Sequence, residues 1–338
     1  MSLIDQTNSM LPVIETELHR QIARLDQPRL RPFYDMLNYH MGWISEDQAH
    51  RATGKRIRPM LLLLVTLSCS QEWLHAIPAA AAIELVHNFS LVHDDIQDNS
   101  PIRHGMPTVW QKYGIPMAIN VGDALFAIAN QAILDLYDGN TAAEKVIKTG
   151  RILHNACLDL TCGQFLDISY EKRNDMSIDD YWPMIEGKTA ALLSACTQIG
   201  AILGNADDST IEQYRIFGRD LGLAFQVQDD LIGVWGEEAL TGKSTASDLL
   251  ERKNSLPILY GINQKGKFAQ HWFASESGLG EVVQAAQMLK EEGAYDFTKR
   301  EAIRLTAQAS DALRNANPKG EAGFALVELV NKLLVRES

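Results

Sequence analysis

Two aspartate pairs carry the strongest chemical signal in this sequence. The first lies in LVHDDIQDNSPIRHG, residues 91–105, where Asp94 and Asp95 are followed by a third carboxylate, Asp98. In a helix, at about 100° per residue, Asp98 lies about 40° from Asp94 on the same face. Because carboxylates this close repel one another, we expect a cation among them, and such ligands suit Mg²⁺, which uses carboxylates, water and substrate phosphates. The alternative interpretation is a solvated acidic helix end.

The second pair, Asp229 and Asp230, lies in QVQDDLIGVWGE, residues 226–237. Here the position four residues after the first aspartate is Gly233, so the third carboxylate has no counterpart. The frames FSLVHDD and FQVQDD resemble each other, and two such pairs can face one another across the cavity of a helix bundle. We therefore predict a second metal position at this pair. We also expect Gly233→Asp to change activity only modestly.

Basic residues accompany both motifs. Those of interest are Lys55 and Arg58 in GKRIRP, Arg103 after the first motif, Lys188 in GKT, and Lys243 and Lys253 in TGKSTASDLLERKNSLP. Each of them alone would be read as a solvated surface charge. In a chain with a net charge of −12, cations beside acidic motifs indicate a phosphate ligand held by Mg²⁺ on one side and Lys or Arg on the other.

Long apolar helices must position these residues. Segments 79–98, 116–137, 188–204 and 211–232 are apolar at the spacing of a helix face, with GKT opening the third. There is no series of alternating strands and no Asn-Gly hairpin. No breaker-rich stretch is long enough to be a domain linker. The sequence therefore predicts one all-α domain over residues 1–338, with about a dozen helices packed in a large bundle.

Composition excludes several other classes of protein. The acidic charge balance disfavours general nucleic-acid binding. The cysteines, Cys69, Cys157, Cys162 and Cys196, show no CxxC spacing, which argues against a zinc site or a disulfide framework and suits a reducing compartment. The sequence shows no signal peptide and no apolar run long enough to span a membrane. We expect a cytoplasmic protein without a membrane span.

These residues resemble the trans-isoprenyl diphosphate synthases of the polyprenyl synthetase family. Five motifs stand in family order between GKRIRP and RKNSLP, which is most of the sequence. The resemblance implies the isoprenoid synthase fold, in which long, mostly antiparallel helices surround a central cavity, usually in a homodimer. The implied enzyme is a prenyltransferase that condenses an allylic diphosphate with isopentenyl diphosphate, using three Mg²⁺ ions.

The resemblance also implies a role for individual residues. Asp94 and Asp98 would hold two Mg²⁺ ions, with Asp95 supporting them, and Asp229, beside Asp230, would hold the third. The implied catalytic residues are Lys188, Thr189 and Gln226, the last two directing dipoles at the carbocation. Gln164 and Asp167 match a further family motif, GQFLD.

Two sets of residues would bind the diphosphates. Lys55, Arg58 and His87 would bind isopentenyl diphosphate, and His87 lies seven residues before Asp94 on nearly the same helix face. Arg103, Lys188 and Lys243 would bind the allylic diphosphate, with Lys253 nearby. His104 stands where the family has a second arginine, and a neutral imidazole is a weaker phosphate partner than a guanidinium.

The positions four and five residues before the first motif are Ser90 and Phe89. In the family these positions help to set product length. The pattern here resembles short-chain geranylgeranyl or farnesyl diphosphate synthases, with a C20 product first and C15 next. We therefore expect Phe89→Ala to lengthen the product.

Two alternatives stay open. DDLIGVWGE fits the second metal motif of a class I terpene cyclase at Asp229, Asp230 and Glu237, with Gly233 where a hydroxyl belongs. A cyclase acts on one substrate, so Lys55, Arg58 and His87, which would bind the second substrate, would have no role in it. A non-catalytic partner subunit of a synthase is the other alternative, and the intact DDIQD argues against it.

Overall fold

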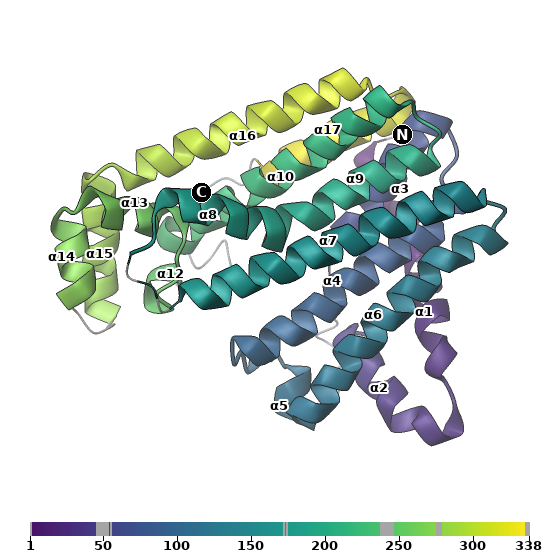
Figure 1. The fold of residues 1–338 in the computed structure, drawn as a ribbon, viewed down its shortest axis with the longest axis horizontal. Helices are drawn as coiled ribbons and strands as arrows, with labels where there is room; N and C mark the ends of the chain where they lie inside the picture. Colours follow the sequence, from purple (N-terminus) through teal and green to yellow (C-terminus); the bar gives the residue numbers. More distant parts are fainter. Residues whose placement is uncertain are drawn as a thin grey trace. The chain divides into compact units, whose positions relative to one another are not determined.

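The structure is a computed structural model that describes residues 2–44, 54, 56–171, 173, 175–236, 247–274 and 279–334. Helices dominate this part of the chain (Figure 1), which confirms the predicted all-α class. Lys55, Lys243 and Glu237 lie outside the described residues.

The chain divides into two compact units. The first comprises Met1–His154, Cys196–Ile211 and Pro318–Leu326, and the second comprises Asn155–Ala195, Glu212–Asn317 and Val327–Ser338. Helices α7 (Ala143–Tyr170), α9 (Ala191–Leu203), α10 (Asp208–Trp235) and α17 (Gly320–Leu334) contribute residues to both units. A single domain over the whole chain stays a prediction.

The first unit is built on two neighbouring long helices, α4 and α6, which lie side by side (Figure 1). Its elements are α1 (Leu3–Ile22), η1 (Ala23–Leu25), η2 (Pro28–Leu30), α2 (Arg31–His40), α3 (Ile57–Ser70), η3 (Leu74–Ala76), α4 (Ile77–Gln97), β1 (Ile102–Arg103), β2 (Met106–Pro107), α5 (Val109–Tyr113) and α6 (Ile115–Asp138). Helix α4 begins with a proline in its first turn and ends where Asp98 caps it, as the Asn-Ser-Pro sequence predicts. The small residues Ala79–Ala82 are buried and allow close packing around α4.

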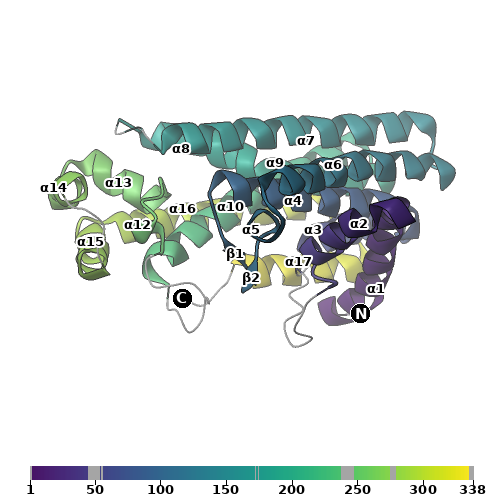
Figure 2. The ribbon, with the colours of Figure 1, turned by 90° about the horizontal axis from the view of Figure 1, so that it is seen from below.

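The second unit holds the remaining elements. They are α8 (Ile178–Ile185), the π-helix η4 (Glu186–Ala190), α12 (Ser247–Leu250), α13 (Leu256–Gln264), α14 (Lys267–Ala274), α15 (Leu279–Glu291) and α16 (Ala294–Ala316). Helices α13, α14 and α15 pack together (Figures 1 and 2) around a core that includes Ile258, Phe268 and Leu289. Helix α10 stays helical through Gly233 and ends at Trp235.

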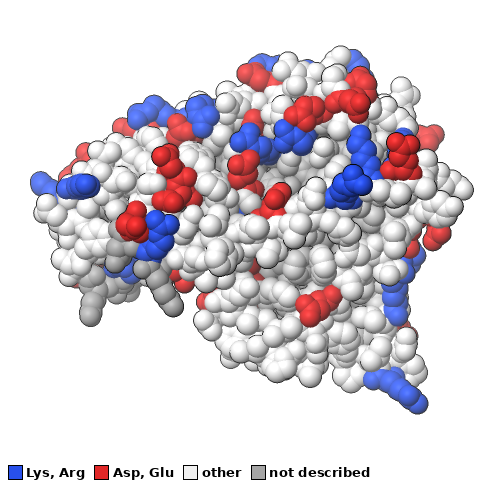
Figure 3. All heavy atoms as spheres, in the orientation of Figure 1, with Lys and Arg blue, Asp and Glu red and all other residues white. Residues whose placement is uncertain are grey.

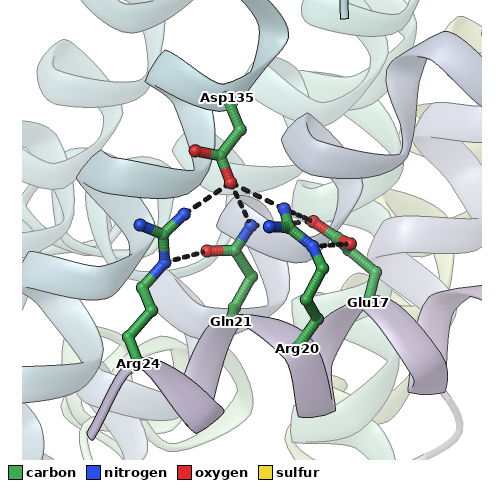
Figure 4. Close-up of polar contacts among 5 residues, drawn as sticks. All are labelled: Glu17, Arg20, Gln21, Arg24 and Asp135. Carbon is green, nitrogen blue, oxygen red and sulfur yellow. Dashed lines mark hydrogen bonds and ion pairs between the residues drawn. The ribbon is translucent and has the colours of Figure 1, made fainter. Parts of the chain in front are cut away.

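A cluster of polar and charged side chains fastens α1 and the following η1 to α6 in the first unit (Figure 4). Asp135 Oδ2 accepts hydrogen bonds from Arg20 at 2.6 Å, Arg24 at 2.5 Å and Gln21 at 2.7 Å. Partial burial alone would raise the pKa of Asp135, but these donors outweigh it and hold the pKa below its ordinary value. The ionised carboxylate therefore stabilises the contact between the two helices.

Asp135→Asn is expected to lower the free energy of unfolding at pH 7 by about 1–2 kcal/mol, because Arg20 and Arg24 are partly exposed and keep some hydration. The folded-state pKa is lowered, so this stabilisation is present above the unfolded pKa of about 4 and is lost as the pH falls through the folded value. Urea denaturation at pH 7 and at pH 3 measures the difference. The control is Asp138→Asn, at an exposed carboxylate on the same helix. Equal stability of wild type and variant at pH 7 would contradict this account.

Candidate active site

The first aspartate motif contains one half-buried, one buried and one exposed carboxylate. Asp94, in the last turn of α4, is half-buried, and Asp98, its C-cap, is exposed. Asp95 is 2% exposed, and its Oδ1 accepts from Arg103 Nη2 at 2.8 Å and Nε at 2.9 Å. Burial raises the pKa of Asp95 against the opposing effect of Arg103. Asp95 therefore holds Arg103 in place, whereas Asp94 and Asp98 are less buried than Asp95.

Arg103 is presented by a short hairpin that the sequence analysis did not expect. Strands β1 and β2 pair antiparallel, Ile102 with Pro107 and Arg103 with Met106 (Figure 2). Both turn residues have positive φ, 51° at His104 and 78° at Gly105, as a type I′ turn requires. Histidine tolerates this conformation better than most residues, which is why His-Gly can replace Asn-Gly here. His104 is exposed and lines a small pocket of about 60 Å³ with Asp95 and Arg103.

Arg58 and His87 are brought together, as the resemblance implies. Arg58 Nη1 lies 3.0 Å from His87 Nε2. A guanidinium can only donate, so Nε2 is the acceptor and the imidazole is neutral. Burial, followed by the charges of Arg58 and Arg103, lowers the pKa of His87 well below its ordinary value, which agrees with that tautomer.

A third basic side chain, His40 at the end of α2, was missed in the sequence. It lines the same small pocket as Asp95, Arg103 and His104. Burial and then the charge of Arg103 lower its pKa to about 3, so the ring is neutral. Its Nε2 is buried and has no hydrogen-bond partner in the described part of the chain. A lone histidine between two long segments gives no sequence signal.

Arg56, two residues before Arg58, has a structural role instead. It is 3% exposed, and its guanidinium donates to Glu15 Oε1 at 2.7 Å and to Glu84 Oε1 at 2.8 Å. These ion pairs tie the start of α3 to α1 and α4. The positive φ of Arg56, 46°, directs the chain into α3 from this position.

Lys188 and Thr189 lie within the π-helix η4, so they do not open a new helix as expected. The chain is already helical from Ile178 in α8. The widened turn lies where two glycines meet: a Cβ added at Gly163 would come within 2.1 Å of the Lys188 nitrogen, and one at Gly187 within 2.5 Å of the Asp159 carbonyl oxygen. Single π turns of this kind often occur at functional sites. Lys188 forms an ion pair with Asp167, which gives the GQFLD motif a structural explanation.

A hydrogen-bonded series links Thr189 to the second aspartate pair. Thr189 Oγ1 donates to Gln226 Oε1 at 2.8 Å, and Gln226 Nε2 donates to Asp230 Oδ1 at 2.9 Å. Asp230 Oδ2 accepts from Tyr181 Oη at 2.7 Å and from the Leu256 nitrogen at 2.9 Å. This series fixes the amide of Gln226 and commits the Thr189 proton, which leaves the threonine oxygen as an acceptor. Tyr181, fully buried, was also missed in the sequence.

The two aspartate pairs share one pattern of exposure. Asp230 is 5% exposed and is held by three protein donors, whereas Asp229 is half-buried. Burial, and then the nearby charge of Asp248, raises the pKa of Asp230 to about 7. In each pair, therefore, the second carboxylate is buried and accepts hydrogen bonds from protein donors, and the first is half-buried.

The chain-length residues lie on α4 before the first motif. Ser90 is buried, and its hydroxyl donates to the His87 carbonyl oxygen at 2.8 Å. The ring of Phe89 packs on Phe126 of α6, with centroids 5.1 Å apart, and edge-on to His93 at 5.7 Å. Phe126 is therefore a second aromatic residue beside the one predicted.

The remaining basic residue that the structure describes is Lys253. Its Nζ lies 2.7 Å from Glu251 and 4.0 Å from Asp248, and the side chain is 55% exposed. Its proposed role near a diphosphate stays a prediction, as do the roles of Lys55 and Lys243.

The donors that are present fit Mg²⁺ held together with a diphosphate. Within the described ranges, no group of three His, Cys, Asp or Glu side chains could hold a metal ion by itself. Mg²⁺ keeps several waters and is usually bound through one or two carboxylates and substrate phosphates. Asp94 and Asp98 in the first unit, and Asp229 in the second, are carboxylates of the kind that suits that chemistry.

Comparison with known proteins shows the family of this chain. Residues 45–289 match the Polyprenyl synthetase family. The chain belongs to this family. The polyprenyl synthetase is 38% identical to the geranylgeranyl diphosphate synthase of Mycobacterium tuberculosis, over 88% of this chain and 85% of that protein. It is 34% identical to a (2E,6E)-farnesyl diphosphate synthase of Mycobacterium bovis, over 98% and 95% respectively.

A solved structure extends the likeness to the fold. Geranylgeranyl pyrophosphate synthetase from Pyrococcus horikoshii has a TM-score of 0.89 and 30% identity, covering 99% of this chain and 98% of that one. The isoprenoid synthase fold is therefore confirmed. The protein is a short-chain trans-prenyltransferase, and members of its family generally use Mg²⁺.

Proposed function

We propose that this polyprenyl synthetase condenses an allylic diphosphate with isopentenyl diphosphate to give an all-trans product, C20 first and C15 next. The observation that supports it best is the shared exposure pattern of the two aspartate pairs. In each pair one carboxylate is buried and accepts hydrogen bonds from protein donors, whereas its neighbour, Asp94 or Asp229, is only half-buried, as suits a ligand shared with water and phosphate around Mg²⁺.

The described residues would divide the reaction as follows. Asp94 and Asp98 would hold two Mg²⁺ ions and Asp229 a third, and the charge on the departing pyrophosphate would be stabilised by these ions. Arg103 and Lys188, each anchored by a carboxylate, would bind the allylic diphosphate. When the allylic C–O bond breaks, the oxygen of Thr189 can stabilise the carbocation, because its proton is committed to Gln226.

The second substrate then completes the bond changes. The double bond of isopentenyl diphosphate attacks the cation and forms a carbon–carbon bond, and the proton lost from the adduct passes to pyrophosphate. No protein base is required for this step.

The Arg58–His87 contact favours a synthase over a terpene cyclase, because a cyclase has one substrate. Arg58→Gln is expected to raise the KM for isopentenyl diphosphate about tenfold or more, since a charge-assisted contact is lost. The KM for the allylic diphosphate should stay within about twofold. Steady-state kinetics with each substrate varied in turn measure this, with Arg300→Gln, an exposed arginine on α16, as the control. Equal increases in both KM values would contradict the assignment.

We also propose that the protein is a homodimer that uses the exposed face of α6. This helix exposes Ile115, Met117, Ile119, Phe126, Leu134 and Tyr137, and few charged side chains cover α6 in the view of Figure 3. In the described part of the chain, α6 is also the one helix long and apolar enough to cross a membrane, with 44% of its most apolar stretch buried. Asp123, 67% exposed on the same helix, disfavours lipid as the partner and leaves a second copy of the chain.

The dimer is tested by substitution on this face. Ile119→Glu combined with Leu134→Glu is expected to shift the wild-type dimer toward the monomer mass of 37.6 kDa, because two charges would be buried at the contact. Sedimentation velocity measures the shift. The control is Phe324→Glu, which alters a 79% exposed side chain on α17. A wild-type protein that sediments as a monomer would contradict the proposal.

A cytoplasmic location is the last element of the proposal. The cysteines Cys69, Cys157, Cys162 and Cys196 are free, as suits a reducing compartment.

A further inference from the structure

The space beside Gly233 is filled by the side chain of Asp248. A Cβ added at Gly233 would lie 2.4 Å from Asp248 Oδ2, 2.5 Å from its Cγ and 2.6 Å from its Oδ1. All three atoms of that carboxylate therefore stand where a side chain at position 233 would begin. No residue larger than glycine fits there unless Asp248 moves.

Position 233 also lies on the metal-binding face of α10. The helix continues through Gly233, so this residue is one turn beyond Asp229 on the same face. The first motif has its third carboxylate, Asp98, at the equivalent position after Asp94. The carboxylate of Asp248 thus reaches, from α12, the place that the missing aspartate of the second motif would occupy.

Asp248 is largely buried at this place, where its side chain is 9% exposed. Its ion pair with Lys253 spans 4.0 Å, and Lys253 is closer to Glu251, at 2.7 Å. The carboxylate of Asp248 is thus held in a largely buried position beside Gly233.

We propose that Asp248 supplies the third carboxylate of the second aspartate motif, in place of the aspartate that the chain lacks at position 233. This inference rests on the proposed function, because it assumes a cation at Asp229. Asp248 acts there as a positioning residue, which accepts hydrogen bonds from the water shell of that cation. Outer-shell partners of this kind typically contribute about tenfold to a hundredfold to metal affinity.

The same geometry revises the expectation for Gly233→Asp. The substitution was expected to be mild because it would restore an outer carboxylate. In the structure that place is taken, so the new side chain would collide with Asp248 and add a further negative charge. We now expect Gly233→Asp alone to be damaging, and to become tolerable when Asp248 is removed.

The test uses the full-length protein and three variants. Asp248→Asn keeps the shape and removes the charge. Gly233→Asp with Asp248→Gly moves the carboxylate from α12 to α10. The matched control is Glu251→Gln, which removes an exposed carboxylate paired with the same lysine. The probe is Mn²⁺ with inorganic pyrophosphate, followed by electron paramagnetic resonance, and the melting temperature is measured without metal.

Asp248→Asn is expected to weaken pyrophosphate-dependent Mn²⁺ binding by about tenfold or more, without lowering the metal-free melting temperature. The double variant should recover most of the binding, and Glu251→Gln should bind as the wild type does. A purely structural Asp248 would give the opposite pattern, with a lower melting temperature and unchanged Mn²⁺ affinity.

Three results would contradict either the role of Asp248 or the proposed function on which that role rests. Wild-type Mn²⁺ affinity in Asp248→Asn overturns the role of Asp248. So does a double variant that melts at the wild-type temperature but binds no better than Asp248→Asn. A wild-type protein that binds no Mn²⁺ with pyrophosphate overturns the proposed function itself, which separates that failure from the first two.

Discussion

Asp229→Ala is expected to lower kcat by about two to three orders of magnitude while the protein stays folded. Asp229 is only half-buried, so we expect its loss to remove charge stabilisation from the ionisation step with little effect on the packing. The measurement is kcat at saturating Mg²⁺ and substrates, together with a thermal melt.

Asp230→Ala is the informative comparison. Its carboxylate accepts from Tyr181, Gln226 and the Leu256 nitrogen, and removing it leaves these three donors, two of them buried, without their acceptor. We expect the free energy of unfolding to fall by about 2–4 kcal/mol. Activity should also fall, because Gln226 loses the acceptor that fixes its amide. If Asp229→Ala destabilised the protein as much as Asp230→Ala, the division of roles between the two aspartates would be wrong.

Phe89→Ala is expected to shift the product by at least one C5 unit toward longer chains. The ring of Phe89 packs against that of Phe126. Replacing Phe89 with alanine opens space that its ring now fills, and a longer product can occupy that space. Phe126→Ala should lengthen the product in the same direction, a result that the sequence alone did not suggest. Product masses from C5, C10 and C15 primers with excess isopentenyl diphosphate measure the shift.

Phe324→Ala serves as the control, because that exposed side chain lies on α17, away from Phe89 in the sequence. An unchanged product distribution in Phe89→Ala would show that this residue does not limit chain length.

Local spacing in the sequence predicts which candidate site residues share a helix face. Asp94 and Asp98 share a helix face by their four-residue interval, and His87 lies two turns before them. Spacing alone could not show that Arg56 has a structural role whereas Arg58, two residues later, is a candidate binding residue. Arg56 is committed to the buried Glu84, and that assignment depends on which helix packs against α3.

The features that sequence analysis missed are all non-local. The π turn at Lys188 depends on the contact between Gly163 and Gly187, which are 24 residues apart in the chain. Tyr181 and His40 act through tertiary contacts that no spacing announces. Asp248 occupies the side-chain space of Gly233, although it follows a segment with no resemblance to the first motif. The sequence shows that position 233 has no aspartate, but it does not show that the carboxylate of Asp248 occupies that place.

The most direct test of the central claim is one product assay. Purified protein is incubated with Mg²⁺ and farnesyl or geranyl diphosphate, with and without isopentenyl diphosphate, and the products are identified by mass. The account predicts a longer prenyl diphosphate, C20 in largest amount, formed only when both substrates and Mg²⁺ are present. A hydrocarbon formed without isopentenyl diphosphate would contradict it in favour of a cyclase, and a protein inert with every primer would contradict it in favour of a non-catalytic partner subunit.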